Sequence, residues 1–265
     1  MNITWEMDEQ NERIVAYMPE ITNKEIELIE EKFLTESTGK IIIYTLSNYS
    51  HKLEKLKFKK EAEMEGFFNG EAAQIMTRYI KEDRGLSKYP EEANEVLKIV
   101  GQDKKDLSQV KTDYHLELVK EKELPELAAL FKTVFPVYPT NVYDPEYLKK
   151  AMETDYIFIT AKNDKHEIIG AASAMKSGFG SAEITDCAVL PEYRGKQILH
   201  GIILALEQEL VKQGIFNSYS ITRSISAGMN MTVKRLGYLY QGTLTNNCII
   251  STGFEDMNIW TKRLI

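Results

Sequence analysis

The segment Cys187 to Leu210, CAVLPEYRGKQILHGIILALEQEL, combines residue types that favour binding of an anion. An extended apolar run ends at Pro191, and an amphipathic helix follows with no Asp or Glu in its first turn. Basic side chains therefore stand at the positive end of a helix dipole, where cations are disfavoured, and the first amides of the helix lack intrahelical partners. Together they predict an anion site suited to a pyrophosphate, although an ordinary strand-to-helix corner with solvated basic side chains fits the spacing equally well. The predicted site comprises Arg194, Gly195, Lys196, Gln197, Ile198 and Leu199.

The strand predicted just before this corner, SAEITDCAVL, carries two carboxylates and a thiol. A period of two places Glu183, Thr185 and Cys187 on one face and Asp186 on the other. No His or other base accompanies Cys187, so a small apolar role in the sheet is favoured over an acyl-cysteine intermediate.

The elements around this segment predict an α/β protein with a mixed sheet. Their order after residue 113 is β-α-α-β-β-β-α-β-α-β-β, which places helices on the faces of the sheet. Strands are predicted at 114–119, 156–161, 167–175, 181–190, 216–222, 238–244 and 254–264, and helices at 123–135, 144–153, 195–213 and 227–237.

Composition excludes several classes of function. The chain has 265 residues, is 43% apolar and contains no uninterrupted apolar run of membrane-spanning length, so we expect a soluble cytoplasmic protein with no membrane partner. Two cysteines and four scattered histidines predict no metal site. A net charge of −7 argues against nucleic-acid binding and weakly favours a cationic small substrate. The basic run from His51 to Lys60 is interpreted as a solvated helix face rather than a polyanion patch.

The first hundred residues resemble part of the second half. Residues 26–45 and 203–222 both read as a helix, a glycine and a strand, and residues 71–80 parallel residues 255–264. Chance similarity between two αβ segments is the alternative. The polar stretch from Gly101 to Asp113 predicts a boundary between a domain at 1–110 and one at 111–265. A true repeat makes the first domain a half-domain with a structural or substrate-covering role.

A long strand followed by PEYRGKQIL, within this order of elements, resembles the acetyl-CoA site of the GNAT N-acetyltransferases. Their loop reads Gln/Arg-x-x-Gly-x-Gly/Ala. Arg194 matches its first position, whereas Gln197 and Leu199 replace the usual glycine and Gly/Ala. The resemblance implies the GNAT acyl-CoA N-acyltransferase fold and acetyl-CoA as co-substrate. It also implies cofactor contacts from Cys187, Ala188, Val189 and Asn230.

A narrower resemblance covers nearly the whole chain. GFFNGEAAQIM, FPVYP, SAEITDCAVLPEYRGK, TRSISAGMN, GYLYQGTLTNN and EDMNIWTK are together similar to the bacterial and archaeal β-lysine N6-acetyltransferases. That similarity implies transfer of acetyl to the terminal amine of β-lysine, 3,6-diaminohexanoate, and a product that serves as a compatible solute. Acetylation of polyamines or protein lysines, a non-catalytic acyl-CoA sensor and a homodimer remain open alternatives.

The resemblance also implies roles at the reacting centre. In related enzymes the position of Glu183 carries the general base, which here requires a pKa raised by burial, since an exposed Glu is a weak base. The alternative is a rim carboxylate that only attracts the ammonium group. The backbone N–H of Val189 is implied as donor to the thioester carbonyl. The usual acid for the thiolate is absent, since Val233 holds its position, and Tyr238 or solvent is left for that role.

The acceptor carries a carboxylate and a second amine besides the reacting one. Arg223, after the strand NSYSIT, is the predicted carboxylate ligand, with a plain surface arginine as the alternative. The remaining predicted substrate contacts are Asp186, Tyr138, Asn246 and Asn247.

Overall fold

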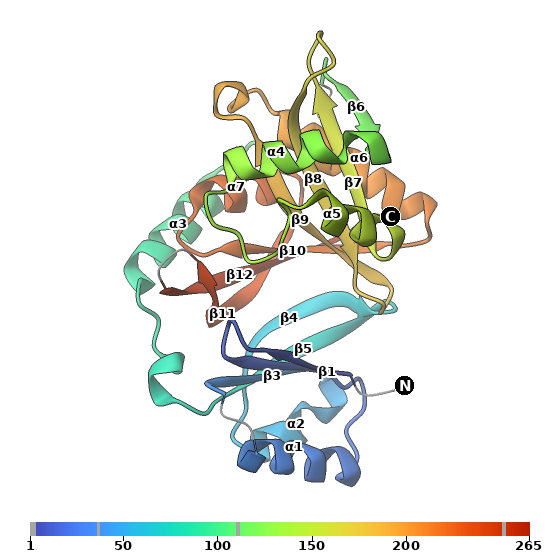
Figure 1. Cartoon of the computed structure of the whole chain (residues 1–265). Coiled ribbons are helices and arrows are strands. Elements are labelled where there is room, and N and C mark those ends of the chain that lie inside the picture. Colours follow the sequence, from blue (N-terminus) through green and yellow to red (C-terminus); the bar gives the residue numbers. More distant parts are fainter. Residues whose placement is uncertain (1–3, 36–37, 110–111, 251–252) are drawn as a thin grey trace.

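The computed structural model describes residues 4–35, 38–109, 112–250 and 253–265 (Figure 1). Within these residues the strands form one continuous mixed sheet in the order β1-β2-β3-β5-β4-β11-β12-β10-β9-β8-β7-β6. The predicted mixed α/β class is therefore confirmed. The predicted domain boundary, between residues 110 and 111, lies outside the described residues and stays a prediction. No helix in the described ranges is long and apolar enough to cross a membrane.

The N-terminal half packs one face of its strands against two helices. Ile14, Ile41 and Ile43 share a buried cluster with Leu53 and Phe58 beneath the sheet. The predicted basic helix ends at Lys55. Phe58 lies between this helix and the next strand, and its side chain is buried in the core. The elements of this half are β1 (Thr4–Asp8), β2 (Arg13–Tyr17), α1 (Asn23–Thr35), β3 (Lys40–Leu46), α2 (Ser47–Lys55), β4 (Lys59–Phe68), β5 (Glu71–Tyr79), the 3₁₀ turn η1 (Glu82–Gly85) and α3 (Pro90–Gln102).

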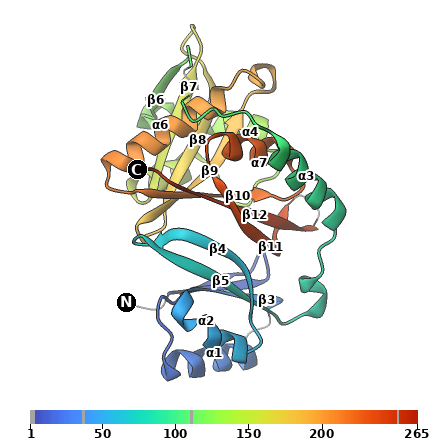
Figure 2. The ribbon, with the colours of Figure 1, turned by 180° about the vertical axis from the view of Figure 1, so that it is seen from behind.

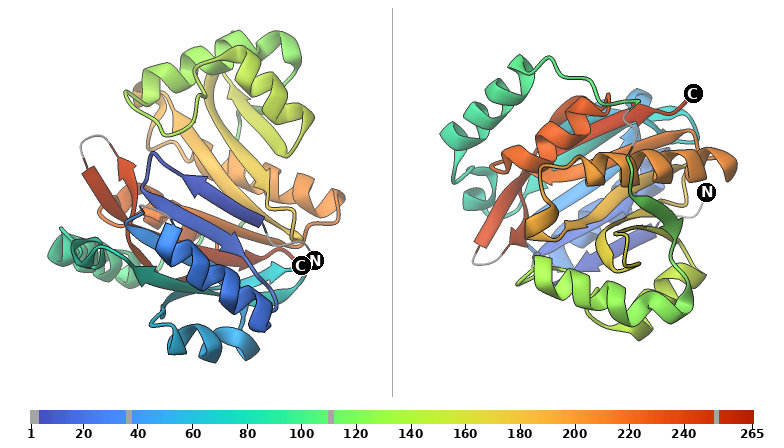
Figure 3. Two further views of the ribbon diagram at one scale, coloured as in Figure 1. Left: turned by 60° about the horizontal axis from the view of Figure 1, so that its bottom comes forward. Right: turned by 90° about the horizontal axis from the view of Figure 1, so that it is seen from above.

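The C-terminal half has helices on both faces of its sheet, as Figure 3 shows. α4 and α5 cover one face, and α6 and α7 cover the other. Every strand and helix predicted after residue 113 is present, but α6 begins three residues later than expected, at Ile198. The elements are β6 (His115–Leu118), η2 (Glu121–Glu123), α4 (Leu124–Val134), α5 (Pro145–Glu153), β7 (Tyr156–Lys162), β8 (Ile168–Lys176), β9 (Ser181–Val189), η3 (Pro191–Tyr193), α6 (Ile198–Lys212), β10 (Asn217–Arg223), α7 (Ala227–Arg235), β11 (Leu239–Ile250) and β12 (Gly253–Arg263).

The two halves repeat one arrangement of elements. The sheet order β2-β3-β5-β4 is mirrored by β9-β10-β12-β11, and the parallel pair β2–β3 corresponds to the parallel pair β9–β10. Helices α1 and α2 occupy the chain positions of α6 and α7. This correspondence agrees with the repeat expected from the sequence and is more than chance similarity of two short segments would produce.

The halves meet where β4 pairs with β11. Gly242 stands opposite Ala62, and a Cβ on Gly242 would lie 2.4 Å from the carbonyl oxygen of Glu61. Because the backbones approach this closely, only glycine fits there without displacing one strand. The sheet therefore runs through both halves without a break.

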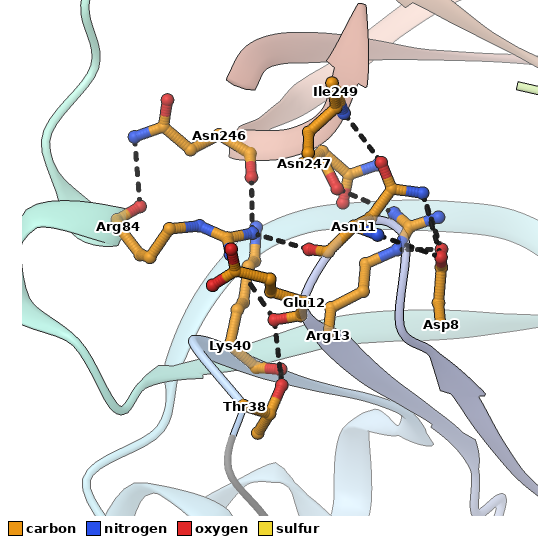
Figure 4. Close-up of polar contacts among 10 residues, drawn as sticks. All are labelled: Asp8, Asn11, Glu12, Arg13, Thr38, Lys40, Arg84, Asn246, Asn247 and Ile249. Carbon is orange, nitrogen blue, oxygen red and sulfur yellow. Dashed lines mark hydrogen bonds and ion pairs between the residues drawn. The ribbon is translucent and has the colours of Figure 1, made fainter. Parts of the chain in front are cut away.

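A set of polar residues, called the seam below, ties β11 to the N-terminal half (Figure 4). The Asn11 side chain accepts a hydrogen bond from the Ile249 amide at 2.6 Å. Buried Arg84 donates to the Asn246 carbonyl at 3.0 Å, and the Asn246 amide donates to the Leu86 carbonyl at 2.7 Å. The seam comprises Asp8, Asn11, Arg13, Lys40, Arg84, Asn246 and Asn247.

Helix α3 crosses from one half to the other, as Figures 1 and 2 show. Val96 and Val100 pack in the core that α6 and α7 share. After the helix, Asp103 accepts hydrogen bonds from Arg235 of α7 at 2.7 and 3.1 Å. These contacts fix the relative position of the halves and so the surroundings of β9.

Candidate active site

Strands β9 and β10 separate at the centre of the C-terminal half. They pair in parallel only from Ser181 with Asn217 to Glu183 with Tyr219. Leu190 donates its amide to the Ile169 carbonyl of β8 at 3.0 Å. Because successive amides along a strand point to opposite sides, the Val189 N–H points to the side that β10 has left open. The predicted donor is thus directed into the gap between the two strands.

The corner after β9 exposes a row of unpaired amides. Gly195 and Gln197 have positive φ values of 77° and 61°, which delays the helix to Ile198. Among the described residues, no acceptor is bound to any backbone amide from Gly195 to His200. Arg194 and Lys196 are exposed beside these amides, and the first turn has no acidic residue. These residues fit a pyrophosphate group such as that of acetyl-CoA.

Gln197 explains one departure from the GNAT loop. The position usually held by glycine has the left-handed conformation that glycine adopts without cost, and Gln197 adopts it at a cost of roughly 1 kcal/mol. The replacement of glycine therefore leaves the loop geometry in place. Leu199, at the usual Gly/Ala position, packs against the core beneath α6.

A bulge in β9 places Glu183 and Asp186 on the same face. Between paired positions β8 advances two residues, from Ala171 to Ser173, while β9 spans three, from Ala188 back to Thr185. Asp186 takes the extra step with φ of 50°. The predicted strict alternation was therefore wrong, because one extra residue reverses the faces of a strand. Cys187 packs instead toward the core under α6.

The environment of Glu183 raises its pKa to about 8, because burial disfavours the charged form and the Asp186 carboxylate adds repulsion. The charge of Arg13 on β2 has the opposite effect and lowers the pKa of Glu183. Asp186 is 4% exposed and accepts a hydrogen bond from Ser173 at 2.5 Å, and burial also raises its pKa. The raised pKa required for a base at Glu183 is present.

Four tyrosines gather around Glu183, and none of them was predicted from the sequence. Burial raises the phenol pKa of Tyr17, Tyr44, Tyr156 and Tyr219, and the charge of Glu183 raises each further. The ring centroids of Tyr17 and Tyr44 lie 4.9 Å apart. In the described structure no hydrogen bond satisfies the hydroxyls of Tyr17, Tyr44 and Tyr219. Tyr219 pairs with Glu183 in the register of β10 with β9, which the sequence does not specify.

Tyr138 and Cys187 flank the bulge. Tyr138 stacks on Phe135 at 4.4 Å between ring centroids, and the Asp186 carboxylate beside it helps burial to raise its phenol pKa. Burial also raises the pKa of the Cys187 thiol well above its usual range, with Asp186 and Glu183 adding to the effect. A thiol kept protonated is a poor nucleophile, which favours direct acyl transfer.

Asn230 does not fit the predicted role as a cofactor ligand. It is wholly buried, and its carbonyl oxygen accepts hydrogen bonds from Thr222, Asn258 and Trp260 at 2.8 to 2.9 Å. Its amide donates to the Arg223 and Ser226 carbonyls. Every polar site of the side chain is thus used to hold the turn between β10 and α7.

The predicted substrate ligands at the end of β10 and in β11 have other partners. Arg223 binds Glu255 through two hydrogen bonds of 2.7 Å, so its planar fork is already occupied. Asn246 belongs to the seam, where its amide bonds to backbone carbonyls. Asn247 is 4% exposed, and its carbonyl accepts a hydrogen bond from Arg13 at 3.0 Å.

Neither Val233, at the position of the usual acid, nor Tyr238, left as a candidate, is placed to protonate the leaving thiolate. Val233 is buried in the core. Tyr238 is 2% exposed and hydrogen-bonds to Ser218 at 2.8 Å, so it does not face the gap beside β9. In the described part of the chain, no three His, Cys, Asp or Glu residues are placed to hold a metal ion.

Comparison with known proteins assigns the chain to a family. The model of the Acetyltransferase (GNAT) family matches residues 124–238. N-acetyltransferase YodP of Bacillus subtilis is 35% identical over 86% of this chain and 84% of its own length. Proteins named beta-lysine N(6)-acetyltransferase from Methanococcus maripaludis and Methanosarcina mazei are 31% and 30% identical. Their matches cover 84% and 87% of this chain and 82% and 93% of their own lengths.

Solved structures share the fold of part of the chain. A GNAT phosphinothricin acetyltransferase from Sinorhizobium meliloti, solved with acetyl-CoA, is 15% identical with a TM-score of 0.51. It covers 57% of this chain and 89% of its own length. With the splayed strands, the free amides after β9 and the relatives that match most of their length, these findings establish that the chain belongs to the GNAT family as an acetyl-CoA-dependent N-acetyltransferase.

Proposed function

We propose that the protein transfers acetyl from acetyl-CoA to the N6 amine of β-lysine, giving N6-acetyl-β-lysine by direct transfer in a ternary complex. The observation that carries the proposal is the match of two β-lysine N(6)-acetyltransferases across 82% and 93% of their lengths. Following the same resemblance, we propose that the product is a compatible solute.

The main chemical difficulty is the proton on the amine. An alkylammonium group with pKa near 10.4 is only about 0.04% neutral at pH 7, and removing the proton costs roughly 4.6 kcal/mol. The pKa of an ordinary carboxyl group, near 4.3, lies about 6 units below that of the ammonium group, so proton transfer to it is unfavourable. Glu183, at a pKa of about 8, narrows the gap to about 2.4 units. The substrate's positive charge favours the ionised carboxylate on binding.

In the proposed reaction, Glu183 accepts the N6 proton, directly or through water. The nitrogen lone pair attacks the thioester carbonyl carbon, a C–N bond forms, and the C–S bond breaks to release the thiolate. The second N6 proton then passes to the thiolate, directly or through solvent, which leaves a neutral amide and CoA-SH. The Val189 amide donates a hydrogen bond to the carbonyl oxygen as negative charge develops on it. Amides 195–200 with Arg194 and Lys196 hold the pyrophosphate.

The surroundings of Glu183 support an aliphatic cation as acceptor. Tyr17, Tyr44 and Tyr219 surround Glu183 with hydroxyls that have no protein partner among the described residues, and such oxygens can accept hydrogen bonds from an ammonium group. Because Tyr17 and Tyr44 come from the N-terminal half, that half covers the acceptor side of the site. A bulky protein substrate fits such a covered site poorly.

The test is thiol release with β-lysine, lysine, spermidine and a lysine peptide at equal concentrations. The proposal predicts the highest kcat/KM for β-lysine, with acetyl on N6 when the product is analysed by NMR. A higher kcat/KM for spermidine or the peptide would show that β-lysine is not the preferred substrate. No turnover with any amine, despite acetyl-CoA binding, would favour an acyl-CoA sensor.

A further inference from the structure

We propose that Arg13 of β2 binds the carboxylate of the acceptor, so that the N-terminal half selects amino acids over simple polyamines. The inference rests on the proposed function, because it requires an acceptor with a carboxylate remote from the reacting amine. It assigns to Arg13 the role that the sequence analysis gave to Arg223.

Arg13 lies on the face of β2 that is turned toward the active site. Residues two apart in a strand share a face, which groups Arg13 with Val15 and Tyr17. Val15 and Tyr17 pack in one cluster with Tyr219, the residue paired with Glu183. The face of the N-terminal sheet that bears Arg13 therefore covers the acceptor side of Glu183.

The Arg13 guanidinium is held in place with one nitrogen to spare (Figure 4). Its Nε donates to Asp8 at 2.8 Å, and its Nη1 donates to the Asn247 carbonyl at 3.0 Å. Its Nη2 has no hydrogen-bond partner within the described residues, and the side chain is 19% exposed. A fixed guanidinium with a free Nη2 can donate to a carboxylate oxygen, and little side-chain entropy is lost on binding because the group is already held.

The other cations of the seam are already engaged. Lys40 is wholly buried and pairs with Glu61 at 2.9 Å while donating to the Thr245 carbonyl at 2.7 Å. Arg84 is 3% exposed and donates to backbone carbonyls of the seam. Neither side chain reaches an open surface, so Arg13 is the seam cation available to an acceptor.

Charge and reach support the pairing of Arg13 with Glu183. The Arg13 charge lowers the pKa of Glu183, so the two groups interact across the face that they share. The six bonds from N6 to the carboxyl carbon of β-lysine span roughly 7–8 Å when extended. Glu6 and Asp8, opposite Val15 and Arg13 on β1, add negative charge beside the carboxylate site, where the second ammonium of a β-amino acid would lie.

The experiment measures selectivity rather than activity alone. The ratio of kcat/KM for β-lysine to that for 1,4-diaminopentane, which lacks only the carboxylate, is determined for wild type, Arg13→Met and Arg223→Met. The ratio should fall roughly 30- to 1,000-fold in Arg13→Met, in line with loss of a charged pair, and by less than about 3-fold in Arg223→Met. The melting shift produced by acetyl-CoA confirms that each variant is folded.

A change in the substrate tests the same contact if Arg13→Met does not fold. The carboxamide of β-lysine should be a poorer acceptor than β-lysine for the wild-type enzyme by a comparable factor. The role of Arg13 would be overturned, and the proposed function left standing, by either of two results. One is a wild type that acetylates β-lysine and its carboxamide equally well, and the other is an unchanged ratio in folded Arg13→Met. Wild type with no turnover of β-lysine would overturn the proposed function and this inference together.

Discussion

Glu183 and Asp186 lie on one face of β9, although a regular strand would turn residues three apart to opposite sides. The bulge at Asp186 brings the carboxylates together, and the Asp186 charge adds to burial in disfavouring ionisation of Glu183. Ser173 donates to Asp186 and so stabilises its charged form. Glu183 receives no such donor in the described structure, and its pKa rises to about 8. Asp186 is thus held by a hydrogen bond as a structural carboxylate, and Glu183 is the carboxylate left to act as a base.

The raised pKa of Glu183 predicts that the ligand-free fold is destabilised at high pH. Its folded pKa of about 8 exceeds the unfolded value near 4.5, so stability is lost as pH rises between these values. Glu183→Gln removes this penalty and should raise Tm at pH 8. A gain of about 1 kcal/mol in the free energy of unfolding corresponds to about 2–4 °C in a chain of this size, and we expect at least that much. The gain should vanish near pH 4.5. Glu65→Gln, at an exposed position, is the control, and a Tm at pH 8 no higher than that of wild type would contradict burial of an ionisable Glu183.

The corner after β9 should carry acetyl-CoA binding. Ligand that binds only the folded state raises Tm by mass action. Arg194→Ala with Lys196→Ala should reduce the acetyl-CoA-induced Tm shift, because both cations flank the free amides. Lys212→Ala, at the other end of α6, should leave the shift intact. Equal shifts in the double variant and wild type would place the pyrophosphate elsewhere.

Asn230 should stabilise the fold without contacting acetyl-CoA. Asn230→Ala leaves the Thr222, Asn258 and Trp260 donors unsatisfied in the core, so we expect a loss of about 2–4 kcal/mol in urea unfolding. The acetyl-CoA Kd of the folded fraction should change by less than about 3-fold. A large rise in Kd with unaltered stability would restore the cofactor role.

His200 predicts a second pH dependence of stability, in the acid range. It is 9% exposed, and neither ring nitrogen has a hydrogen-bond partner among the described residues. Burial, with the Arg235 and Lys105 charges, lowers its pKa to about 4. The folded state resists protonation, so stability falls as pH drops from about 6.5 to 4. His200→Phe should lose less stability than wild type between pH 7 and 4.5, by on the order of 1–2 kcal/mol. His51→Phe is the exposed control, and an unchanged pH dependence in His200→Phe would rule out this assignment.

The order of elements after residue 113 could be read from hydrophobic periodicity. The helix-glycine-strand pattern suggested the repeat but left chance similarity open. The bulge could not be predicted, because period-two alternation contains no signal for one extra residue at Asp186. Arg223 was a reasonable carboxylate ligand until its partner Glu255 was known, which depends on the register of β10 with β12. Arg13 and Tyr17 reach the site only through packing between halves, and no local pattern encodes that contact.

The central claim is that Glu183 removes the proton from the acceptor amine, and kcat of Glu183→Gln with saturating β-lysine tests it most directly. Gln keeps the shape and removes the basicity, so kcat at pH 7 should fall by about 10²- to 10⁴-fold and recover in part at higher pH, where more amine is neutral. Acetyl-CoA affinity should barely change. A kcat near that of wild type at pH 7, with only KM raised, would contradict the base role and leave Glu183 as an electrostatic attractor.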